Sequence, residues 1–325
     1  GGLLSMLVAA LVWSLVMAVS FEICRITKKY DYKSFFKQLL GRFWFLYEIL
    51  YSLLILIVLS VIGAASGEIV QNIFAIPTTI GIVGLFVVIG LFTFYGSAVI
   101  EKFMGSWSIL LYTCFFLLVV FSFVYFGEDI KTNYKENVIT SGWFTDGVRY
   151  AGYNIAAVPA VFFSLKHITK RKEAIYSGII AGIIAIIPAI FLFIAMMGKY
   201  PEINQAAVPS TELLLHIDLP WFSILFQVVL LGTLVQTGVG LIHAINERIA
   251  ATLTSKNKKM PKLARPAVAI IILLIALFLA SRFGIIQLIA NGYGILTIGF
   301  IAVFVIPVLT IGIYKIIVQS RENSN

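Results

Sequence analysis

Nine apolar runs, most of them about the length of a membrane-spanning helix, make up most of this chain. A bilayer's hydrocarbon core is about 30 Å thick, so about 20 helical residues cross it. The runs therefore predict an all-α polytopic membrane protein. The least apolar run is the fifth, and the last is long enough to be bent. The nine predicted spans are Leu3–Cys24, Phe43–Ala65, Thr79–Ile100, Trp107–Phe126, Trp143–Leu165, Ala174–Met197, Trp221–Ile249, Pro266–Ser281 and Ile285–Ile317.

Composition excludes a soluble globule. Of 325 residues, 60% are hydrophobic and 12% are charged, about half the charged fraction of an ordinary soluble domain. The net charge of +9 could suggest a nucleic-acid partner, but the basic residues fall in short loops without interleaved aromatic side chains, which argues against one. The two cysteines, Cys24 and Cys114, are far apart and indicate neither a disulfide framework nor a metal site.

The loops predict the orientation of the spans. Segments rich in Lys and Arg lie on the cytoplasmic side, and they follow the first, fifth and seventh spans and close the chain. The short loop after the third span holds Lys102 against Glu101. The alternate loops are acidic or mixed, with Glu68 after the second span, Glu128, Asp129, Lys131, Lys135 and Glu136 after the fourth, Glu202, Glu212 and Asp218 after the sixth, and Arg282 after the eighth. The first span therefore runs inward, and the C-terminus is cytoplasmic. The basic residues are Arg25, Lys28, Lys29, Lys33, Lys37 and Arg42; Lys166, Lys170, Arg171 and Lys172; Arg248, Lys256, Lys258, Lys259, Lys262 and Arg265; and Lys315 and Arg321.

The first span starts outside, and the chain begins with Gly1 rather than Met. An N-terminus usually starts inside, so we expect one further helix before Gly1. That helix would bring the total to ten spans, nine of which are present here.

The fifth span contains the stretch RYAGYNIAAVPAVFFSL, residues 149–165, whose polar and helix-breaking residues are unusual in an apolar run. Tyr153 and Asn154 lie about ten residues into it, which at about 1.5 Å per residue is near the bilayer midplane. Pro159 removes a backbone donor and clashes with the carbonyl of Ile155, so we expect the helix to kink or open. Freed backbone groups must face protein or a wet cavity. A midplane solute site is one interpretation; a kinked helix with Asn154 bonded to a neighbour is the other.

Polar residues recur on one helical face in other spans too, which predicts faces turned into the bundle. They are Thr233, Gln236, Thr237, Gly240, His243 and Glu247 in the seventh span, Gln287, Asn291 and Gly294 in the ninth, and Ser60, Gly63, Ser66 and Gly67 in the second. Gly178 and Gly182 in the sixth span form a small-residue pair typical of helix packing.

The ionisable residues predict mainly interfacial pairs. Glu22 precedes Arg25 by three residues and is expected to pair with it or to snorkel to the interface. Glu48 lies one turn into the second span, also near the inner face. Asp146 precedes Arg149 by three residues and is expected to pair with it. His243 is the best titratable candidate near a pathway, although a lone His on a helix face is more often a hydrogen-bonded partner.

Several catalytic signatures are absent from the sequence. It has no Gly-rich phosphate loop, no HExxH, no CxxC and no nucleophile elbow, so an ATP-driven pump or an enzyme is not indicated.

The order of these features resembles the YkvI-type family of bacterial membrane transporters, within the amino acid–polyamine–organocation superfamily, over essentially the whole chain. YAGYNIAAVPAV (150–161) resembles that family's broken sixth helix, and GTLVQTGVGLIHAINERI (232–249) its eighth. The resemblance implies a LeuT-like inverted-repeat bundle forming a single transmembrane domain over 1–325. Residues 1–126 would be the first repeat without its first helix, and 143–317 the second repeat.

The resemblance also implies a function. Tyr153 and Asn154 become solute-site residues, and Thr233 and Thr237 become cation ligands. Gln236 and Asn291, on the polar faces, and Gly152, which flanks Tyr153 and Asn154, join the predicted solute site.

We therefore expect a multi-pass transporter in the bacterial plasma membrane. It would carry a small polar organic solute, possibly an amino acid, coupled to Na⁺ or H⁺ by alternating access, with no other cofactor. A ligand-sensing receptor subunit resembling spore-germinant receptors and a channel are the alternatives. The sequence gives neither the solute nor the oligomeric state.

Overall fold

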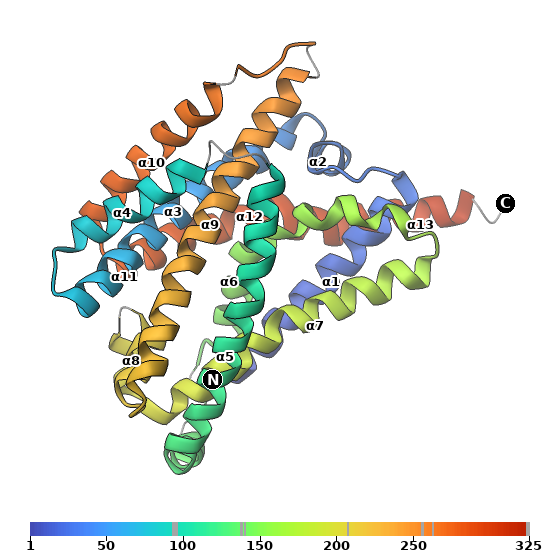
Figure 1. Cartoon of the computed structure of the whole chain (residues 1–325). Coiled ribbons are helices and arrows are strands. Elements are labelled where there is room, and N and C mark those ends of the chain that lie inside the picture. Colours follow the sequence, from blue (N-terminus) through green and yellow to red (C-terminus); the bar gives the residue numbers. More distant parts are fainter. Residues whose placement is uncertain are drawn as a thin grey trace. The chain divides into compact units, whose positions relative to one another are not determined.

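The computed structural model describes residues 1–92, 97–136, 139, 141–206, 208–254, 257–261 and 263–322. These residues are largely helical, and none of them lies in a strand (Figure 1). Seven of the described helices are long and apolar enough to cross a membrane: Gly2–Thr27, Tyr32–Phe74, Lys102–Lys135, Arg171–Lys199, Pro220–Thr254, Ala264–Arg282 and Ile285–Gln319. The prediction of an all-α, multi-pass membrane protein is confirmed at this level.

The two remaining predicted spans are less regular. Helix α4 (Thr78–Phe92) is apolar but has only 15 residues, and it is followed by residues 93–96, which lie outside the described part of the chain. The fifth predicted span is divided between α6 (Trp143–Asn154) and the 3₁₀ helix η2 (Ile155–His167). The predicted count of nine spans depends on these two and stays a prediction.

Several helices extend beyond the predicted spans. Helix α3 (Phe45–Phe74) includes Glu68, and α5 (Ser97–Glu136), with a kink at Phe126, includes Lys102. The prediction that Glu68, Lys102 and the mixed segment 128–136 lie in loops is therefore wrong. Hydropathy marks where a helix leaves the membrane rather than where it ends. Ion pairs three residues apart, such as Lys131 Nζ to Glu128 Oε1 at 2.6 Å, support the polar extension.

The chain divides into two compact units. The first comprises residues 1–54, 136–194 and 292–325, and the second comprises 55–135 and 195–291. Each unit therefore combines segments from both halves of the sequence.

Of the basic residues that predict the orientation, Lys256 and Lys262 lie outside the described residues.

The first unit contains α1 (Gly2–Thr27), α2 (Tyr32–Leu40), η1 (Gly41–Trp44), the start of α3, α6, η2 and most of α7 (Arg171–Met196). It is completed by α12 (Gly294–Phe300), the π-helical η6 (Ile301–Val305) and η7 (Val308–Gly312), and α13 (Ile313–Glu322).

In the first unit α1 packs against both α6 and α7. On α7, Gly178 lies against the backbone of Ala18, and Gly182 lies against Ser14. The Ser14 hydroxyl donates to the Ile179 carbonyl oxygen at 3.1 Å. A side chain at either glycine would separate the helices, so the prediction that this pair serves packing is confirmed.

The second unit contains the rest of α3, α4, α5, α9 (Pro220–Thr254) and α10 (Ala264–Arg282). Shorter elements complete it: η3 (Met197–Lys199), η4 (Glu202–Gln205), α8 (Pro209–Leu215), α11 (Ile285–Gln287) and most of the π-helical η5 (Leu288–Tyr293).

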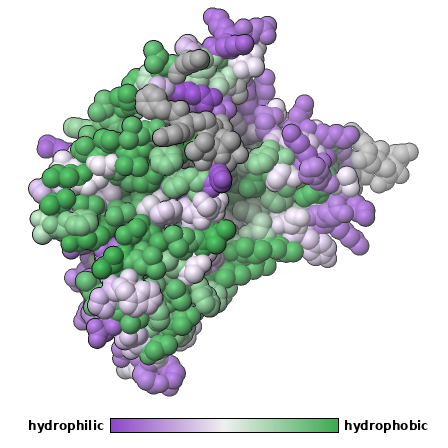
Figure 2. Space-filling view, viewed as in Figure 1, coloured by the Kyte–Doolittle hydropathy of each residue, from purple (hydrophilic) through white to green (hydrophobic). Residues whose placement is uncertain are grey.

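The small residues of the second predicted span bring α3 and α4 together in the second unit. Ser66 Oγ donates to the carbonyls of Gly63 and Gly81, and a Cβ on Gly67 would lie 2.8 Å from the Thr78 carbonyl oxygen. In the face shown by Figure 2, apolar side chains cover much of the helix surfaces, as a lipid-facing protein requires.

Candidate solute site at an interrupted helix

The α-helix of the fifth predicted span ends at Asn154, and a 3₁₀ helix continues to His167. The predicted interruption is confirmed, and the 3₁₀ run begins at Ile155, four residues before Pro159. Proline has no N–H, and its ring clashes with the carbonyl of the residue four before it, here Ile155. Because 3₁₀ runs beyond about four residues are uncommon, a 13-residue run requires support from its neighbours.

Side chains from other helices donate to one backbone carbonyl within the 3₁₀ run and to two carbonyls near the end of α6, just before it. Trp13 Nε1 on α1 donates to the Ala151 carbonyl oxygen at 3.1 Å. The Tyr47 hydroxyl on α3 donates to the Ala156 carbonyl oxygen at 3.0 Å. In a 3₁₀ helix the partner of the Ala156 carbonyl would be the N–H of residue 159, which proline lacks. Tyr47 therefore replaces the donor that Pro159 removes.

A third donor comes from α12. Thr297 Oγ1 lies 3.4 Å from the Arg149 carbonyl oxygen, which makes this the longest of the three bonds. Thr297 also contacts Gly152, where a Cβ would lie 2.7 Å from Thr297 Cγ2. Gly152 is thus required for close packing of α12 on α6, and its predicted contact with solute stays a prediction.

Asn154 bonds locally. Its Nδ2 donates to the Tyr150 carbonyl oxygen, one turn earlier, at 2.9 Å. This bond lies within α6, whereas the packing interpretation predicts a bond to a neighbouring helix, so both interpretations of Asn154 stay predictions. A primary amide has two donors and a carbonyl acceptor, so this bond uses a fraction of its hydrogen-bonding capacity.

Four aromatic side chains form a row beside the interruption. Tyr153 stacks on Tyr293, with ring centroids 4.7 Å apart and planes inclined by 17°. Tyr150 meets Tyr153 edge to face at 5.8 Å, and Trp13 lies 5.8 Å from Tyr150. Sequence reasoning found Tyr153 but missed Trp13, Tyr150 and Tyr293. The spacing of Tyr150 and Tyr153 on one helical face was the available signal; the other two contacts depend on tertiary packing.

The remaining candidates lie in the second unit. Gln236 Nε2 on α9 donates to the Met104 carbonyl oxygen at 2.8 Å and to Ser108 Oγ at 2.9 Å, both on α5. Thr233 Oγ1 donates to the Val229 carbonyl oxygen of its own helix. Thr237 is half-buried on α9, and Asn291 is exposed in η5. The structure does not place the two units relative to each other, so the predicted joining of these residues with Tyr153 and Asn154 stays a prediction.

The predicted ion pair at the end of α1 is confirmed. Arg25 Nε and Nη2 each donate to a Glu22 carboxylate oxygen at 2.7 Å, and Arg171 Nε on α7 lies 3.9 Å from the same carboxylate. The Glu22 side chain is 3% exposed, so its charge is compensated where water cannot reach it. Asp146 and Arg149 form a looser, exposed pair at 4.0 Å.

No group of three or more His, Cys, Asp or Glu side chains within the described residues is arranged to hold a metal ion. The interruption places aromatic faces and an amide beside a non-α backbone.

No protein-family profile matches this chain, and no curated protein matches it significantly.

Proposed function

We propose that this protein is a secondary active transporter that carries a small polar organic solute, possibly an amino acid, at the interrupted helix α6–η2. The observation that supports this most is the change from α to 3₁₀ helix at Asn154 and Ile155 within an apolar chain. Irregular backbone at membrane depth is tolerated only where protein or a wet cavity surrounds it. Transporters use such interruptions to hold solutes.

The contacts around the interruption suggest how it would work. Tyr47 donates to a carbonyl within the 3₁₀ run, and Trp13 donates to one near the end of α6, so side chains of the protein support the irregular backbone without solute. Tyr153 and Asn154 would then supply an aromatic face and an amide to the solute. In the second unit, Thr233 and Thr237, four residues apart on α9, remain the cation ligands that the resemblance to the YkvI-type family implies.

The proposed mechanism is alternating access, in which one group of helices moves against another around the solute. The proposed driving ion is Na⁺ or H⁺, and the LeuT-like bundle of the YkvI-type family is the proposed architecture. We also propose the plasma membrane as its location, with a cytoplasmic C-terminus.

The decisive experiment uses the whole protein in liposomes. A thermal-shift screen of the twenty common amino acids, with and without Na⁺, identifies binders, and each binder is then tested for counterflow across the liposome membrane. Saturable counterflow that depends on Na⁺ or on a proton gradient is the expected result. Binding without flux would instead indicate a receptor subunit, and non-saturating flux without ion coupling would indicate a channel. Either outcome overturns the proposal.

A further inference from the structure

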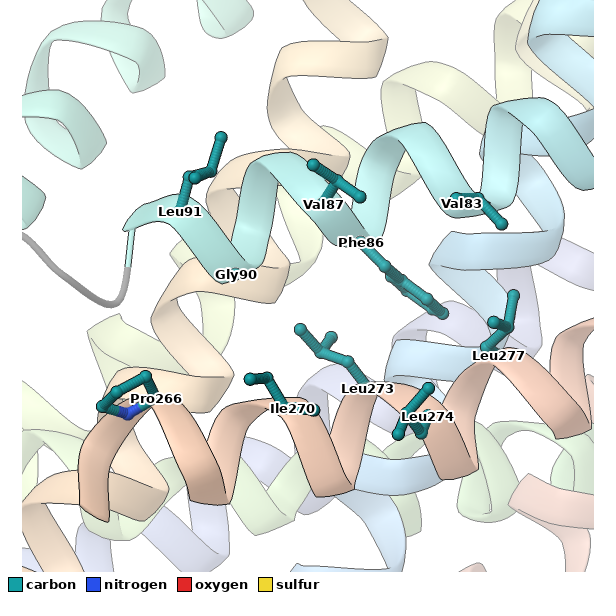
Figure 3. Close-up of a pocket in the computed structure, with 10 residues that line it drawn as sticks. All are labelled: Val83, Phe86, Val87, Gly90, Leu91, Pro266, Ile270, Leu273, Leu274 and Leu277. Carbon is teal, nitrogen blue, oxygen red and sulfur yellow. The ribbon is translucent and has the colours of Figure 1, made fainter. Parts of the chain in front are cut away.

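An apolar groove runs between α4 and α10 in the second unit (Figure 3). Its volume is about 330 Å³. Phe86 of α4 and Leu273 of α10 are each 6% exposed and point into the space between the helices. The lining residues are Val83, Phe86, Val87, Gly90, Leu91, Pro266, Ile270, Leu273, Leu274 and Leu277.

Gly90 lies beside open space in this groove. Among the described residues, a Cβ added at Gly90 would have one heavy atom within 4 Å, Leu273 Cδ1 at 3.9 Å, so no packed side chain of these residues fills the groove beside Gly90. The rim is nonetheless strongly apolar and exposed, with Val87 at 55%, Leu91 at 56% and Leu274 at 59%. Exposed apolar surface of this kind in a membrane protein faces lipid or another apolar partner.

The groove has the length of one lipid leaflet. On α10 its lining residues extend from Pro266 to Leu277, which at 1.5 Å per residue is about 16 Å. Half of a bilayer's hydrocarbon core is about 15 Å. A transmembrane helix of a second copy would need a groove about 10 Å wide that spans the whole hydrocarbon core of the bilayer. One acyl chain needs a groove of only about half that length.

Charge distinguishes the two ends of the groove. The end at Leu91 and Pro266 adjoins the segment that leads into α10, which carries exposed Lys258 and Lys259 and also Arg265. One carboxylate is paired there, with Glu247 Oε1 2.8 Å from Arg265 Nη2. The described start of α4 and end of α10, at the opposite end, carry one cation, Arg282. Basic clusters at a membrane surface attract anionic headgroups.

We propose that the α4–α10 groove is a binding site for an anionic glycerophospholipid, with one acyl chain along Phe86, Gly90 and Leu273 and its phosphate at Lys258 and Lys259. Apolar burial of the chain and charge at one end act together, so neither a neutral lipid nor a free phosphate would bind as well. The site is separate from the interrupted helix and does not depend on which solute is carried.

Native mass spectrometry of the whole protein tests the proposal. The delipidated protein in detergent is titrated with phosphatidylglycerol or with phosphatidylcholine of the same acyl chains. We expect one tightly held phosphatidylglycerol and weaker binding of phosphatidylcholine. Gly90→Phe should weaken phosphatidylglycerol binding at least about tenfold, because excluding two methylene groups from an apolar groove already has that effect.

Matched variants separate the two parts of the site. Gly84→Phe, on the same helix with open space around its Cβ, should leave lipid binding unchanged. Lys258→Gln and Lys259→Gln should each weaken phosphatidylglycerol about fivefold while sparing phosphatidylcholine, and Arg282→Gln should change neither. These lysines are exposed, so their variants test the site even if Gly90→Phe fails to fold. Equal binding of the two lipids, unchanged binding in the lysine variants, or conversion of a dimer to a monomer by Gly90→Phe would each overturn the proposal.

Discussion

The two units use polar side chains within apolar helices in different ways. In the first unit Trp13 and Tyr47 donate to carbonyls of an interrupted helix. In the second unit Gln236 donates across two regular α-helices. The same sequence signal, a polar residue in an apolar run, thus either completes an irregular backbone or joins regular helices. The difference matters for stability. A buried carbonyl left without a donor costs more free energy than the loss of a polar contact between two helices whose backbone hydrogen bonds are complete.

The two glutamate–arginine pairs of the two units differ in burial. Glu22, beside Arg25 in the first unit, is 3% exposed, whereas Glu247, beside Arg265 in the second, is 48% exposed. Both adjoin basic segments that are predicted to be cytoplasmic. The buried pair is therefore expected to matter for folding, and the exposed pair is expected to contribute little.

The largest expected effect is the all-or-none outcome of a cysteine-labelling experiment. This experiment tests whether the basic segment beside the Glu247–Arg265 pair faces the cytoplasm. With Cys24 and Cys114 replaced by alanine, single cysteines at Thr132 and Gln205 should react with an impermeant thiol reagent in intact cells. A cysteine at Asn257 should react only after permeabilisation, because its segment is basic. Labelling of position 257 in intact cells would show that the predicted orientation is wrong.

The next largest effect compares the two arginines. Arg25→Gln leaves the buried Glu22 carboxylate with Arg171, at 3.9 Å, as its nearest cation, and should lower the free energy of unfolding by about 3–5 kcal/mol. Arg265→Gln should lower it by about 0–1 kcal/mol. Denaturant titration in mixed micelles measures both.

A rescue variant separates charge from packing at the buried pair. Adding Glu22→Gln to Arg25→Gln removes the uncompensated carboxylate and should recover most of the lost stability. Equal losses in the Arg25 and Arg265 variants, or no recovery in the double variant, would contradict the contrast drawn between the two pairs.

Tyr47→Phe tests the support of the interruption itself. Phenylalanine keeps the stacking of ring 47 on Phe36, whose centroid is 3.9 Å away, but removes the donor to the Ala156 carbonyl. We expect a loss of about 1–3 kcal/mol in the free energy of unfolding, because that carbonyl is then buried without this partner. The control is Tyr112→Phe, on a ring that is 64% exposed, with an expected change within about 0.5 kcal/mol. Indistinguishable variants would remove the assigned role of Tyr47.

The sequence predicted features that depend on local spacing. The apolar runs, the Glu22–Arg25 pair three residues apart and the packing of Gly178 and Gly182 follow from helical periodicity. Proline's missing N–H also marked Pro159 as a position where the helix could be interrupted.

Features that depend on distant partners could not be read in this way. Pro188 lies inside an apolar run as Pro159 does, yet α7 remains α-helical around it. Proline alone therefore does not determine the backbone's response. The donors Trp13 and Tyr47 lie 138 and 109 residues away from their acceptors, beyond the range of any local pattern.

Asn154→Ala sharpens the comparison at the proposed solute site. If the amide contacts solute, binding should weaken by about 1–3 kcal/mol, measured by titration of the binder found in the thermal-shift screen. Stability should change less, since the bond from Asn154 Nδ2 to the Tyr150 carbonyl oxygen lies within one helical turn. A variant that loses stability but binds solute normally would establish Asn154 as a packing residue.

The smallest expected effect is at Gln236. Gln236→Met keeps the length of the side chain and removes the donor to α5. The Met104 carbonyl oxygen also accepts from Ser108 Oγ at 2.8 Å, so it does not become unpaired. We therefore expect a loss of about 0.6 kcal/mol, the average measured for polar contacts between membrane helices. A double-mutant cycle with Ser108→Ala isolates the contribution of that contact.

Gln227→Met is the matched control, because Gln227 Nε2 bonds to Ser223 Oγ on its own helix, at 3.2 Å.

The outcome at Gln236 also decides between its two assigned roles. If it only joins α5 to α9, solute binding stays at the wild-type value; if it belongs to the solute site, as its position on the polar face of α9 predicts, binding weakens while stability barely changes. A stability loss as large as that of Tyr47→Phe would mean that contacts between regular helices matter as much as support of an interrupted one. The distinction between the two units would then fail.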